Sequence, residues 1–481
     1  MSVKDKSSDV ECKIGFNITN DIFLPKETEP LLKKYSLEGF SHDLNRNRCG
    51  TKLQTKTQTE KTGTSWYAAS IMVINVALGA GLLNFPQAYD RAGGVFVAIC
   101  VQAILVALVI SALLTLAYCS DVNGSTTYQE VVRSIYGERT RRICSVLIIF
   151  FGFGASVTFV IVIGDQFDTV LSSLYGRNFC HYWYMRREFT VVASSTCIIL
   201  PLAFPKRIDF LKYSSSFGVL AMLYVIFLMI YEYFVGNYTP GLVKTSPTVW
   251  TDVFQVVPTI CFGYQCHMSS VPIYSCLADR RVSNFLRTVL VAMSMCMLAY
   301  SVASSAGYLT FGSHVTSDIL ESYNAKDPVV MIGIAALGAK IYTIYPVVLF
   351  CGRTAIDDLY VQIRGIPPEV VVESERCRRI IIALSWFICS LTLSLLIPNI
   401  GTVIEFMGSL AAVFIFVFPG LCLFKVTLKK DPDLSYFKSR FLVIWAMFLL
   451  AVGTCIFFLV LMQALIRNMS GQAITGKPHI C

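Results

Sequence analysis

Eleven apolar segments constrain this chain more than any other feature of its sequence. An α-helix rises 1.5 Å per residue, so about 20 apolar residues cross the roughly 30 Å hydrocarbon core of a bilayer. With 55% hydrophobic and only 15% charged residues among 481, the chain lacks the polar surface of a soluble protein. The sequence therefore predicts an all-α polytopic membrane protein with eleven transmembrane helices. The segments lie at 66–89, 93–118, 143–165, 189–205, 214–235, 252–276, 284–310, 329–352, 379–398, 400–424 and 441–465.

The chain divides into three parts. Residues 1–64 are rich in Lys, Glu, Ser and Thr and cannot bury enough apolar surface to offset chain entropy, which predicts a disordered cytosolic tail. Residues 65–466 form the predicted transporter domain, with helices 1–5 within 66–235, helices 6–10 within 252–424 and helix 11 at 441–465. Residues 467–481 form a short C-terminal tail, predicted to be luminal.

The basic residues predict the orientation. If the tail is cytosolic, Lys and Arg concentrate in the even-numbered connections between segments, as membrane insertion requires. The formal charge of +9 is therefore assigned to topology, and no nucleic-acid partner is expected. Eleven spans place the C-terminus outside or in a lumen, so Asn237 and Asn468, each in an Asn-x-Ser/Thr pattern, are predicted glycosylation sites.

The first apolar segment is interrupted near its middle by Gly79, Gly81 and Pro86. Non-helical backbone at membrane depth leaves amides and carbonyls unpaired unless they line a cavity or bind a ligand. Amides that start the second half of such a helix can hold an anionic group, and carbonyls that end the first half can hold a cation. The alternative is a glycine-lined face for close helix packing.

A second interruption in the sixth segment, Thr259–His267, favours a binding site over simple packing. Paired breaks in corresponding halves are typical of inverted five-helix repeats with a site near the bilayer midplane. An amino acid could bind its carboxylate to the free amides of such a break, and Na⁺ or H⁺ could bind to the free carbonyls. Membrane lipid, substrate and coupling cation are thus the expected partners of this domain.

Four ionisable residues lie within or beside the apolar segments, where a charge costs about 2.5–3.5 kcal/mol on insertion scales. Lys340 could replace a metal ion or gate by proton loss, and the alternative is that it snorkels to the interface. Glu405 could counter Lys340 or line an outer vestibule. Asp165 is interpreted as a solvated boundary residue. His267 suits proton coupling, although hydrogen bonding within the bundle is the commoner role.

Catalytic signatures are missing from the sequence. The Cys and His residues show no metal-ligand spacing, and neither a hydrolytic triad nor a Walker loop is present. We therefore expect no enzyme activity, no catalytic residue and no cofactor. An ion gradient would supply the energy, at about 2.3 kcal/mol per charge per 100 mV.

The interrupted segments carry a family resemblance that spans about 66–465. Asn75–Pro86 resembles the first-helix signature, and Phe262–Pro272 the sixth-helix signature, of solute carrier family 38. These are the sodium-coupled neutral amino acid transporters of the amino acid/auxin permease superfamily. Residues 127–132, 163–166 and 414–423 are most similar to a lysosomal glutamine and asparagine exporter within that family.

The resemblance implies a LeuT-type fold with a 5+5 inverted repeat and broken helices 1 and 6. It also implies substrate contacts from the backbone and a Na⁺ site at Asn75 and Thr343. Lys340 and Glu405 depart from the family pattern, and an ammonium near the cation site would disfavour Na⁺, so the coupling ion is Na⁺ or H⁺. The implied substrate-binding residues are Gly79, Ala80, Gly81, Leu82, Phe262, Gly263 and Tyr264.

The tail contains an acidic dileucine pattern formed by Glu27, Leu31 and Leu32, which resembles the signal that sorting adaptors read. It predicts a lysosomal or late endosomal membrane and, with the resemblance, export of glutamine or asparagine to the cytosol by alternating access. One alternative is a sodium-coupled importer at the plasma membrane. Another is an amino acid sensor that signals through its tail.

Overall fold

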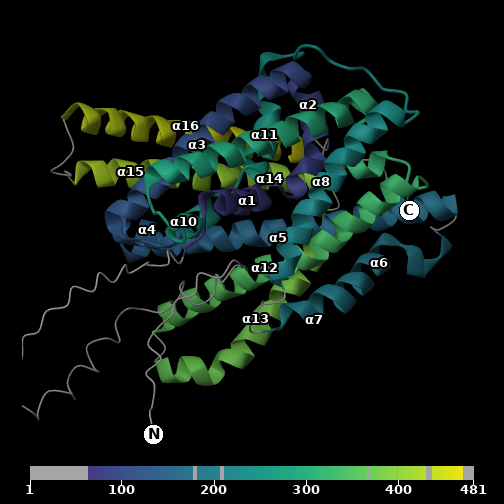
Figure 1. Cartoon of the computed structure of the whole chain (residues 1–481). Coiled ribbons are helices and arrows are strands. Elements are labelled where there is room, and N and C mark those ends of the chain that lie inside the picture. The colour runs from purple at the N-terminus through teal and green to yellow at the C-terminus, as the bar shows by residue number, and fades with distance from the viewer. Residues whose placement is uncertain are drawn as a thin grey trace, which may run out of the picture.

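The computed structural model describes residues 63–176, 181–205, 211–365, 368–397, 399–429 and 436–469, which are helices and short connections. Figure 1 shows the helices side by side in one bundle, with α1 (Trp66–Ala77) in its interior. The predicted sorting motif with Glu27, Leu31 and Leu32 lies outside the described residues. The all-helical expectation is confirmed.

Eight helices are long and apolar enough to cross a membrane, counted within the described residues. One of the eight contains a π-helical turn, η8 (Val413–Val417), between two α-helical parts. The long elements are α3 (Val95–Asn123), α5 (Glu138–Tyr175), α8 (Leu211–Val235), α11 (Val282–Phe311), α12 (Pro328–Arg364), α13 (Pro368–Leu396), α14 (Ile400–Ala412) with α15 (Phe418–Leu428), and α16 (Tyr436–Met469).

A ninth span is bent. α1 is followed by η1 (Ala80–Asn84) and α2 (Phe85–Ala92) at an angle of 49°, and the pair together is long enough to cross. α2 stops at Gly93, whose φ of +97° favours glycine.

The predicted segments 189–205 and 252–276 fold as shorter pieces. The first consists of α6 (Arg187–Ser194), the π turn η4 (Ser195–Ile199) and α7 (Leu200–Ala203). The second consists of η5 (Trp250–Val256), α9 (Val257–Gly263) and α10 (His267–Ser275). The remaining short elements are α4 (Tyr128–Tyr136), η3 (Trp183–Met185), η6 (Gly312–His314) and η7 (Ile319–Ser322). Neither segment forms a single helix of spanning length, so the count of eleven and the inverted repeat stay predictions.

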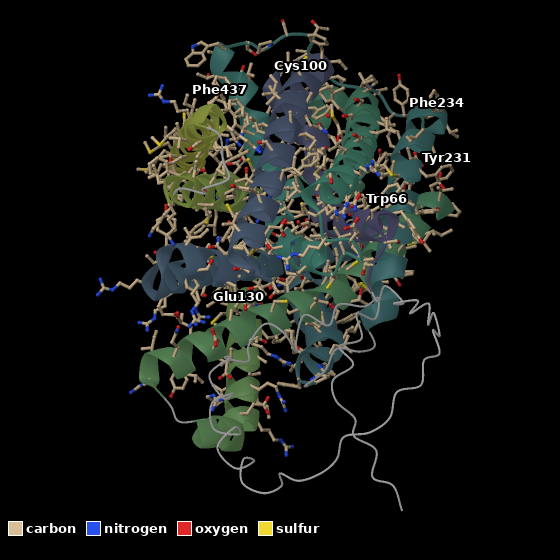
Figure 2. All side chains as sticks on the ribbon, turned by 60° about the vertical axis from the view of Figure 1, so that its left-hand side comes forward. Trp66, Cys100, Glu130, Tyr231, Phe234 and Phe437 are labelled. Carbon is tan, nitrogen blue, oxygen red and sulfur yellow. The ribbon has the colours of Figure 1, made fainter. Side chains whose placement is uncertain are left out.

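The bundle exposes large apolar side chains, and its mostly apolar core also encloses polar ones. Phe234 and Phe437 are 77% and 84% exposed, and they lie on opposite rims of the view in Figure 2. Gln102, Thr158 and Ser304 are fully buried. This distribution is expected where lipid replaces water around the helices.

Candidate functional site: paired helix breaks inside the bundle

The first predicted break is present between α1 and η1. Leu78 and Gly79 leave helical geometry, and Gly79 is extended at φ −117° and ψ −168°. Ala80, Gly81 and Leu82 follow as a buried 3₁₀ turn. α1 itself packs on α11, α10 and α8, so the break lies within the protein and not on the lipid face.

Side chains from two other helices meet the carbonyl end of α1. The Tyr300 hydroxyl of α11 donates to the Ala77 carbonyl at 2.7 Å, and Lys340 Nζ of α12 donates to the Leu78 carbonyl at 2.8 Å. The last carbonyls of a helix have no intrahelical amide partner and carry its negative dipole end. This end of α1 therefore binds a hydrogen-bond donor, which in this structure is the lysine Nζ.

The second predicted break separates α9 from α10. α9 ends at Gly263 and α10 begins at His267, and the Tyr264 amide closes α9 on the Ile260 carbonyl at 2.9 Å. The Gln265 amide group is buried, and neither its oxygen nor its nitrogen has a hydrogen-bond partner among the described residues. An unsatisfied buried polar group costs about 1–3 kcal/mol, so Gln265 marks a place where a ligand or water could bind.

The His267 imidazole is fully buried at the start of α10. Within the described part of the chain neither ring nitrogen makes a hydrogen bond of ordinary geometry, although the Val109 backbone lies close. Both roles considered for His267, proton coupling and hydrogen bonding within the bundle, stay predictions.

The two breaks face one another. A Cβ placed on Gly81 would lie 3.2 Å from the Gly263 Cα and 3.3 Å from the Phe262 ring, so any larger residue would push the two segments apart by a few tenths of an ångström. The Thr259 hydroxyl of α9 also donates to Asn84 Oδ1 of η1 at 3.0 Å. Segments nearly 180 residues apart in sequence thus form one site, as the paired interruptions predicted.

Beside the paired breaks there is unfilled space. A Cβ on Gly79 would meet no atom within 4 Å. The Tyr300 hydroxyl, which caps Ala77, also lies 3.3 Å from the Gly263 carbonyl and so connects the two breaks. Of the predicted substrate-binding glycines, Gly79 therefore lies next to open space, whereas Gly81 and Gly263 are closely packed.

A buried hydrogen-bond chain fixes the tyrosine of the second break. Tyr89 donates to Gln102 Oε1 at 2.7 Å, and Gln102 Nε2 donates to the Tyr264 hydroxyl at 2.8 Å. All three side chains are fully buried. A satisfied polar network of this kind holds its members in one arrangement.

The predicted cation ligands lie along α1 and α12. A Cβ on Gly218 of α8 would approach Lys340 Cε at 3.6 Å and Asn75 Oδ1 at 3.8 Å, so Asn75 and Lys340 share this face of α8. Thr343 lies one turn further along α12, and its hydroxyl donates to the Lys340 carbonyl at 2.8 Å. The roles of Asn75 and Thr343 as Na⁺ ligands stay predictions.

Two interpretations of charged residues need correction. Lys340 does not snorkel, since it is only 5% exposed and its ammonium reaches the Leu78 carbonyl inside the bundle. Glu405 does not counter Lys340. Its carboxylate pairs with Arg91 at 2.8 Å and with Arg467, at the end of the bent span.

Asp165 is likewise not a solvated boundary residue. It is 3% exposed and forms an ion pair of 2.8 Å with Arg187 at the start of α6. The same guanidinium pairs with Asp168 at 2.6 Å. The sequence interpretation was wrong because α6 folds back over the end of α5 and covers the carboxylate.

The predicted glycan acceptors lie at the ends of two helices. Asn237 is exposed in the connection after α8. Asn468 lies in the last turn of α16, and its side chain is outside the described residues. Glycosylation at both stays a prediction.

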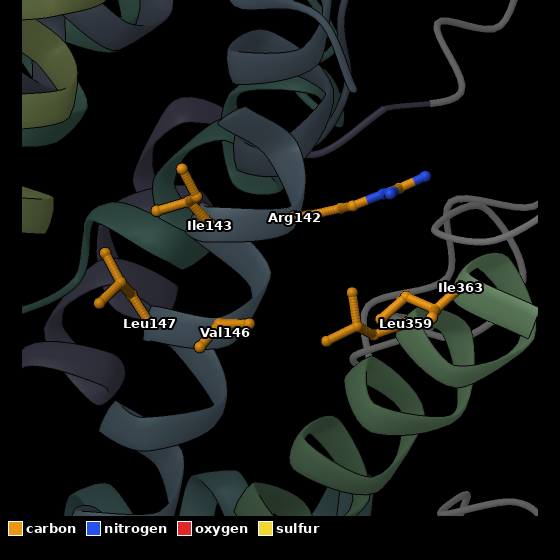
Figure 3. A pocket seen from close by; sticks show the side chains of 6 residues that line it. All are labelled: Arg142, Ile143, Val146, Leu147, Leu359 and Ile363. Carbon is orange, nitrogen blue, oxygen red and sulfur yellow. The ribbon is translucent and has the colours of Figure 1, made fainter. Parts of the chain in front are cut away.

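An apolar groove between α5 and α12 is separate from the breaks. It is lined by aliphatic side chains, with the Arg142 guanidinium extending outward at one end (Figure 3). Such a lining offers no partner for the charged groups of an amino acid, so the groove is not the candidate site. The other lining residues are Ile143, Val146, Leu147, Leu359 and Ile363.

Several residues of the site were not anticipated from the sequence. Tyr300 and Gln102 lie in apolar segments, and the only sequence feature that could have identified them is a polar side chain among apolar ones. Asn84 and Gln265 fall within the two interrupted stretches that the sequence singled out. A rule that every polar side chain in an interrupted segment is a candidate would have found the last two.

Comparisons with known proteins agree with this geometry. A family model described as transmembrane amino acid transporter protein matches residues 62–466. The chain is 39% identical to sodium-coupled neutral amino acid transporter 7 of Danio rerio over 408 residues, 84% of this chain and 88% of the relative. It is 39% identical to the Homo sapiens protein of that name over 398 residues, 82% of this chain and 86% of the relative.

A further relative and one solved structure extend the comparison. Solute carrier family 38 member 8 of Homo sapiens is 35% identical over 399 residues, 81% of this chain and 91% of the relative. A crystal structure of a manganese transporter mutant from Eremococcus coleocola matches with a TM-score of 0.53 at 11% identity, over 86% of this chain and 90% of that one. That likeness concerns the fold alone. The resemblance to solute carrier family 38 is confirmed.

Proposed function

This chain belongs to the transmembrane amino acid transporter protein family, and we propose that it couples movement of a neutral amino acid to movement of a cation. Relatives named as sodium-coupled neutral amino acid transporters support this substrate class and a coupling ion. Glutamine and asparagine are the proposed favoured substrates. The proposed architecture is eleven spans in a LeuT-type 5+5 repeat that works by alternating access.

The observation that carries the proposal is the contact between the two breaks. Gly81 and Gly263 approach closely while open space remains at Gly79, and the Leu78 carbonyl already accepts a hydrogen bond from a cationic group. The backbone on either side of that space is proposed to hold the zwitterion. Gln265 is proposed to satisfy its amide with the side chain of a polar substrate, which favours glutamine and asparagine.

Flux in proteoliposomes tests this function. Purified chain is reconstituted, and uptake of radiolabelled glutamine is measured with Na⁺ and pH gradients imposed separately. We expect saturable uptake, competition by asparagine and stimulation by one gradient. Failure of both gradients to stimulate uptake would rule out coupling.

Asn75→Ala tests the proposed cation site beside α12. It should raise the cation concentration needed for half-maximal uptake, because an oxygen ligand is lost next to the Leu78 carbonyl. Ser111→Ala is the control, since Ser111 bonds only within its own helix in the described structure, to Leu108. Equal cation dependence in wild type and Asn75→Ala would count against the site.

Location and direction are further proposals. The dileucine motif supports residence in the lysosomal or late endosomal membrane with export to the cytosol. Replacing Leu31 and Leu32 with Ala should move the protein to the plasma membrane, where the importer alternative would hold. Unchanged lysosomal residence would refute adaptor sorting.

A sensor is the second candidate function, favoured only by the long polar tail. Deleting residues 1–60 distinguishes a carrier from a sensor. A carrier keeps its uptake in vesicles without the tail, whereas a sensor loses its response to amino acids in cells while any flux is incidental.

A further inference from the structure

A fully buried carboxylate lies in the connection between α11 and α12. Asp318 is 0% exposed at the start of η7. Its Oδ1 accepts the Leu320 amide at 2.9 Å, and its Oδ2 accepts Gln166 Nε2 of α5 at 3.1 Å. Both donors are neutral, and no Lys, Arg or His of the described chain forms an ion pair with Asp318. Burying a carboxylate without a cationic partner disfavours its charged form.

The charges around Asp318 strengthen this effect. The guanidinium of Arg187 binds Asp165 at 2.8 Å, so the nearest arginine is engaged by another carboxylate. Burial and the negative charge of Asp165 raise the pKa of the Asp318 carboxyl to about 8. Asn84 and Gly401, which pack on this connection from η1 and α14, are uncharged. The titratable or charged groups that face Asp318 are Asp165 and Asp168 of α5, Arg187 of α6 and Glu321 on its own turn.

Gln166 offers an acceptor for a proton on Asp318. The Gln166 Oε1 atom is buried and has no hydrogen-bond partner in the described part of the chain. A carboxylic acid at Asp318 can donate to this oxygen once the Gln166 amide turns over. The flip leaves Gln166 Nε2 without a partner in place of Oε1, so this amide can pair with Asp318 in either protonation state, with one amide atom unpaired in each.

The residue next to Asp318 is tied to both helix breaks. Asn84 Nδ2 donates to the Ser317 carbonyl at 3.1 Å, and Asn84 Oδ1 accepts the Thr259 hydroxyl at 3.0 Å. The connection that holds Asp318 thus contacts η1 directly and α9 through one side chain. A change in charge at Asp318 acts on backbone that is hydrogen-bonded to the candidate site.

We propose that Asp318 binds a proton during transport and that protonation favours closure of the 315–323 connection over the paired breaks, the step that traps substrate and limits the rate. The proton comes from water at the outer face, where the proposed topology puts this connection, and adds to Asp318 Oδ2. Its loss restores a buried anion that Asp165 repels, so the connection is released. This inference rests on the proposed transport function and specifies its regulation by protons.

Initial rates of glutamine uptake test the proposal. They are measured in proteoliposomes with the voltage clamped and the inside pH fixed, while the pH at the outer face is varied. A group with a pKa near 8 goes from about nine-tenths to about one-tenth protonated between about pH 7 and pH 9, so the wild-type rate should fall by up to about tenfold. Asp318→Asn, which is permanently neutral, should show no such fall. Asp327→Asn is the matched control, because Asp327 also caps a helix from this connection, and it should behave like wild type.

A second variant tests the direction in which the pH profile should shift. Asp165→Asn removes the repelling charge and frees Arg187, so the midpoint of the pH profile should move to lower pH. A profile unchanged in both Asp318→Asn and Asp165→Asn would overturn the proposal, even where uptake itself is robust.

Thermal unfolding in detergent gives a readout that needs no flux. The folded protein holds a proton at Asp318 that the unfolded chain, with a pKa near 4, releases, so stability is lost as pH rises through the folded pKa. The wild-type unfolding temperature should fall between about pH 5 and pH 8 by more than that of Asp318→Asn, because in this range only the folded protein holds the proton. Equal shifts would refute proton binding at Asp318. Absence of uptake in every variant, with the difference in midpoints intact, would instead refute the transport function.

Discussion

The Lys340 ammonium donates a hydrogen bond to the Leu78 carbonyl oxygen across 2.8 Å, at the point where α1 ends inside the membrane. An ammonium in that position uses an oxygen that a free cation could otherwise bind. Asn75 lies against the same face of α8, so at the proposed cation site Lys340 and a Na⁺ ion would compete for one set of oxygens.

Removing that charge should strengthen the response to sodium. Lys340→Met keeps most of the side-chain length but vacates the Leu78 carbonyl. Two unit charges about 4 Å apart repel by up to about 4 kcal/mol at an effective dielectric constant near 20, so the half-saturating Na⁺ concentration should fall about tenfold for each 1.4 kcal/mol of repulsion removed. Na⁺ titration of glutamine uptake measures it, with the exposed Lys326→Met as the control. Weaker sodium dependence in Lys340→Met would show that the ammonium assists Na⁺ instead of competing with it.

Alanine at the two glycines of the first break should have opposite structural effects. Gly79→Ala adds a methyl group to open space, so the unfolding temperature should change little while the Michaelis constant for glutamine rises. Gly81→Ala drives a methyl group to within 3.2 Å of Gly263, so the breaks must separate and stability should fall by about 1–3 kcal/mol. Uptake kinetics and thermal unfolding of both variants are the measurements. If Gly79→Ala leaves uptake untouched, substrate does not use this space.

Gln265 should matter for binding and not for folding. Gln265→Met removes an amide that has no partner in the described structure, so stability should be unchanged or rise slightly. If the amide binds substrate, the Michaelis constant for glutamine should rise about tenfold, as expected when a buried hydrogen-bonding group is lost. The Michaelis constant for alanine, which has no side-chain amide, serves as the control and should change less.

The Glu405 ion pairs should stabilise the fold. Glu405→Gln leaves Arg91 and Arg467 without the carboxylate they share, in a partly buried position, so the free energy of unfolding should drop by about 1–3 kcal/mol. Asp279→Asn, which breaks an exposed pair with Arg281, should cost less than about 1 kcal/mol. Chemical denaturation of the two variants compares them, and equal losses would show that burial adds nothing at Glu405.

The breaks could be predicted from the sequence because glycine and proline interrupt helices through their own backbone chemistry. Gly79, Gly81 and Gly263 need no knowledge of tertiary neighbours to be recognised. The contact between the two stretches also follows from their spacing once an inverted repeat is assumed.

The charged residues could not be predicted in the same way because their state depends on partners distant in sequence. For Lys340 the sequence leaves a role at a cation site and snorkelling to the interface both open, because it does not reveal the Leu78 carbonyl that accepts the Nζ hydrogen bond. Asp165 was assigned to solvent because nothing local reveals that Arg187 returns to it. Asp318 lies in a polar connection, where a buried carboxylate has no sequence signal.

The span count illustrates a limit of a different kind. Residues 189–205 and 252–276 have the composition of membrane segments. The first forms one short helix, Arg187–Ala203, with a π turn inside it, and a 3₁₀ turn and a non-helical link divide the second into short pieces. A hydropathy average shows that such a stretch is apolar but does not show the turns or links inside it.

The single hydroxyl of Tyr300 lies within hydrogen-bond distance of a carbonyl in each broken segment, Ala77 in one and Gly263 in the other. A phenol has only one proton to give, so a stronger bond to either carbonyl weakens the bond to the other. Any tilt of α11 therefore redistributes one donor between the two halves of the molecule, and neither half can reorganise without the other responding.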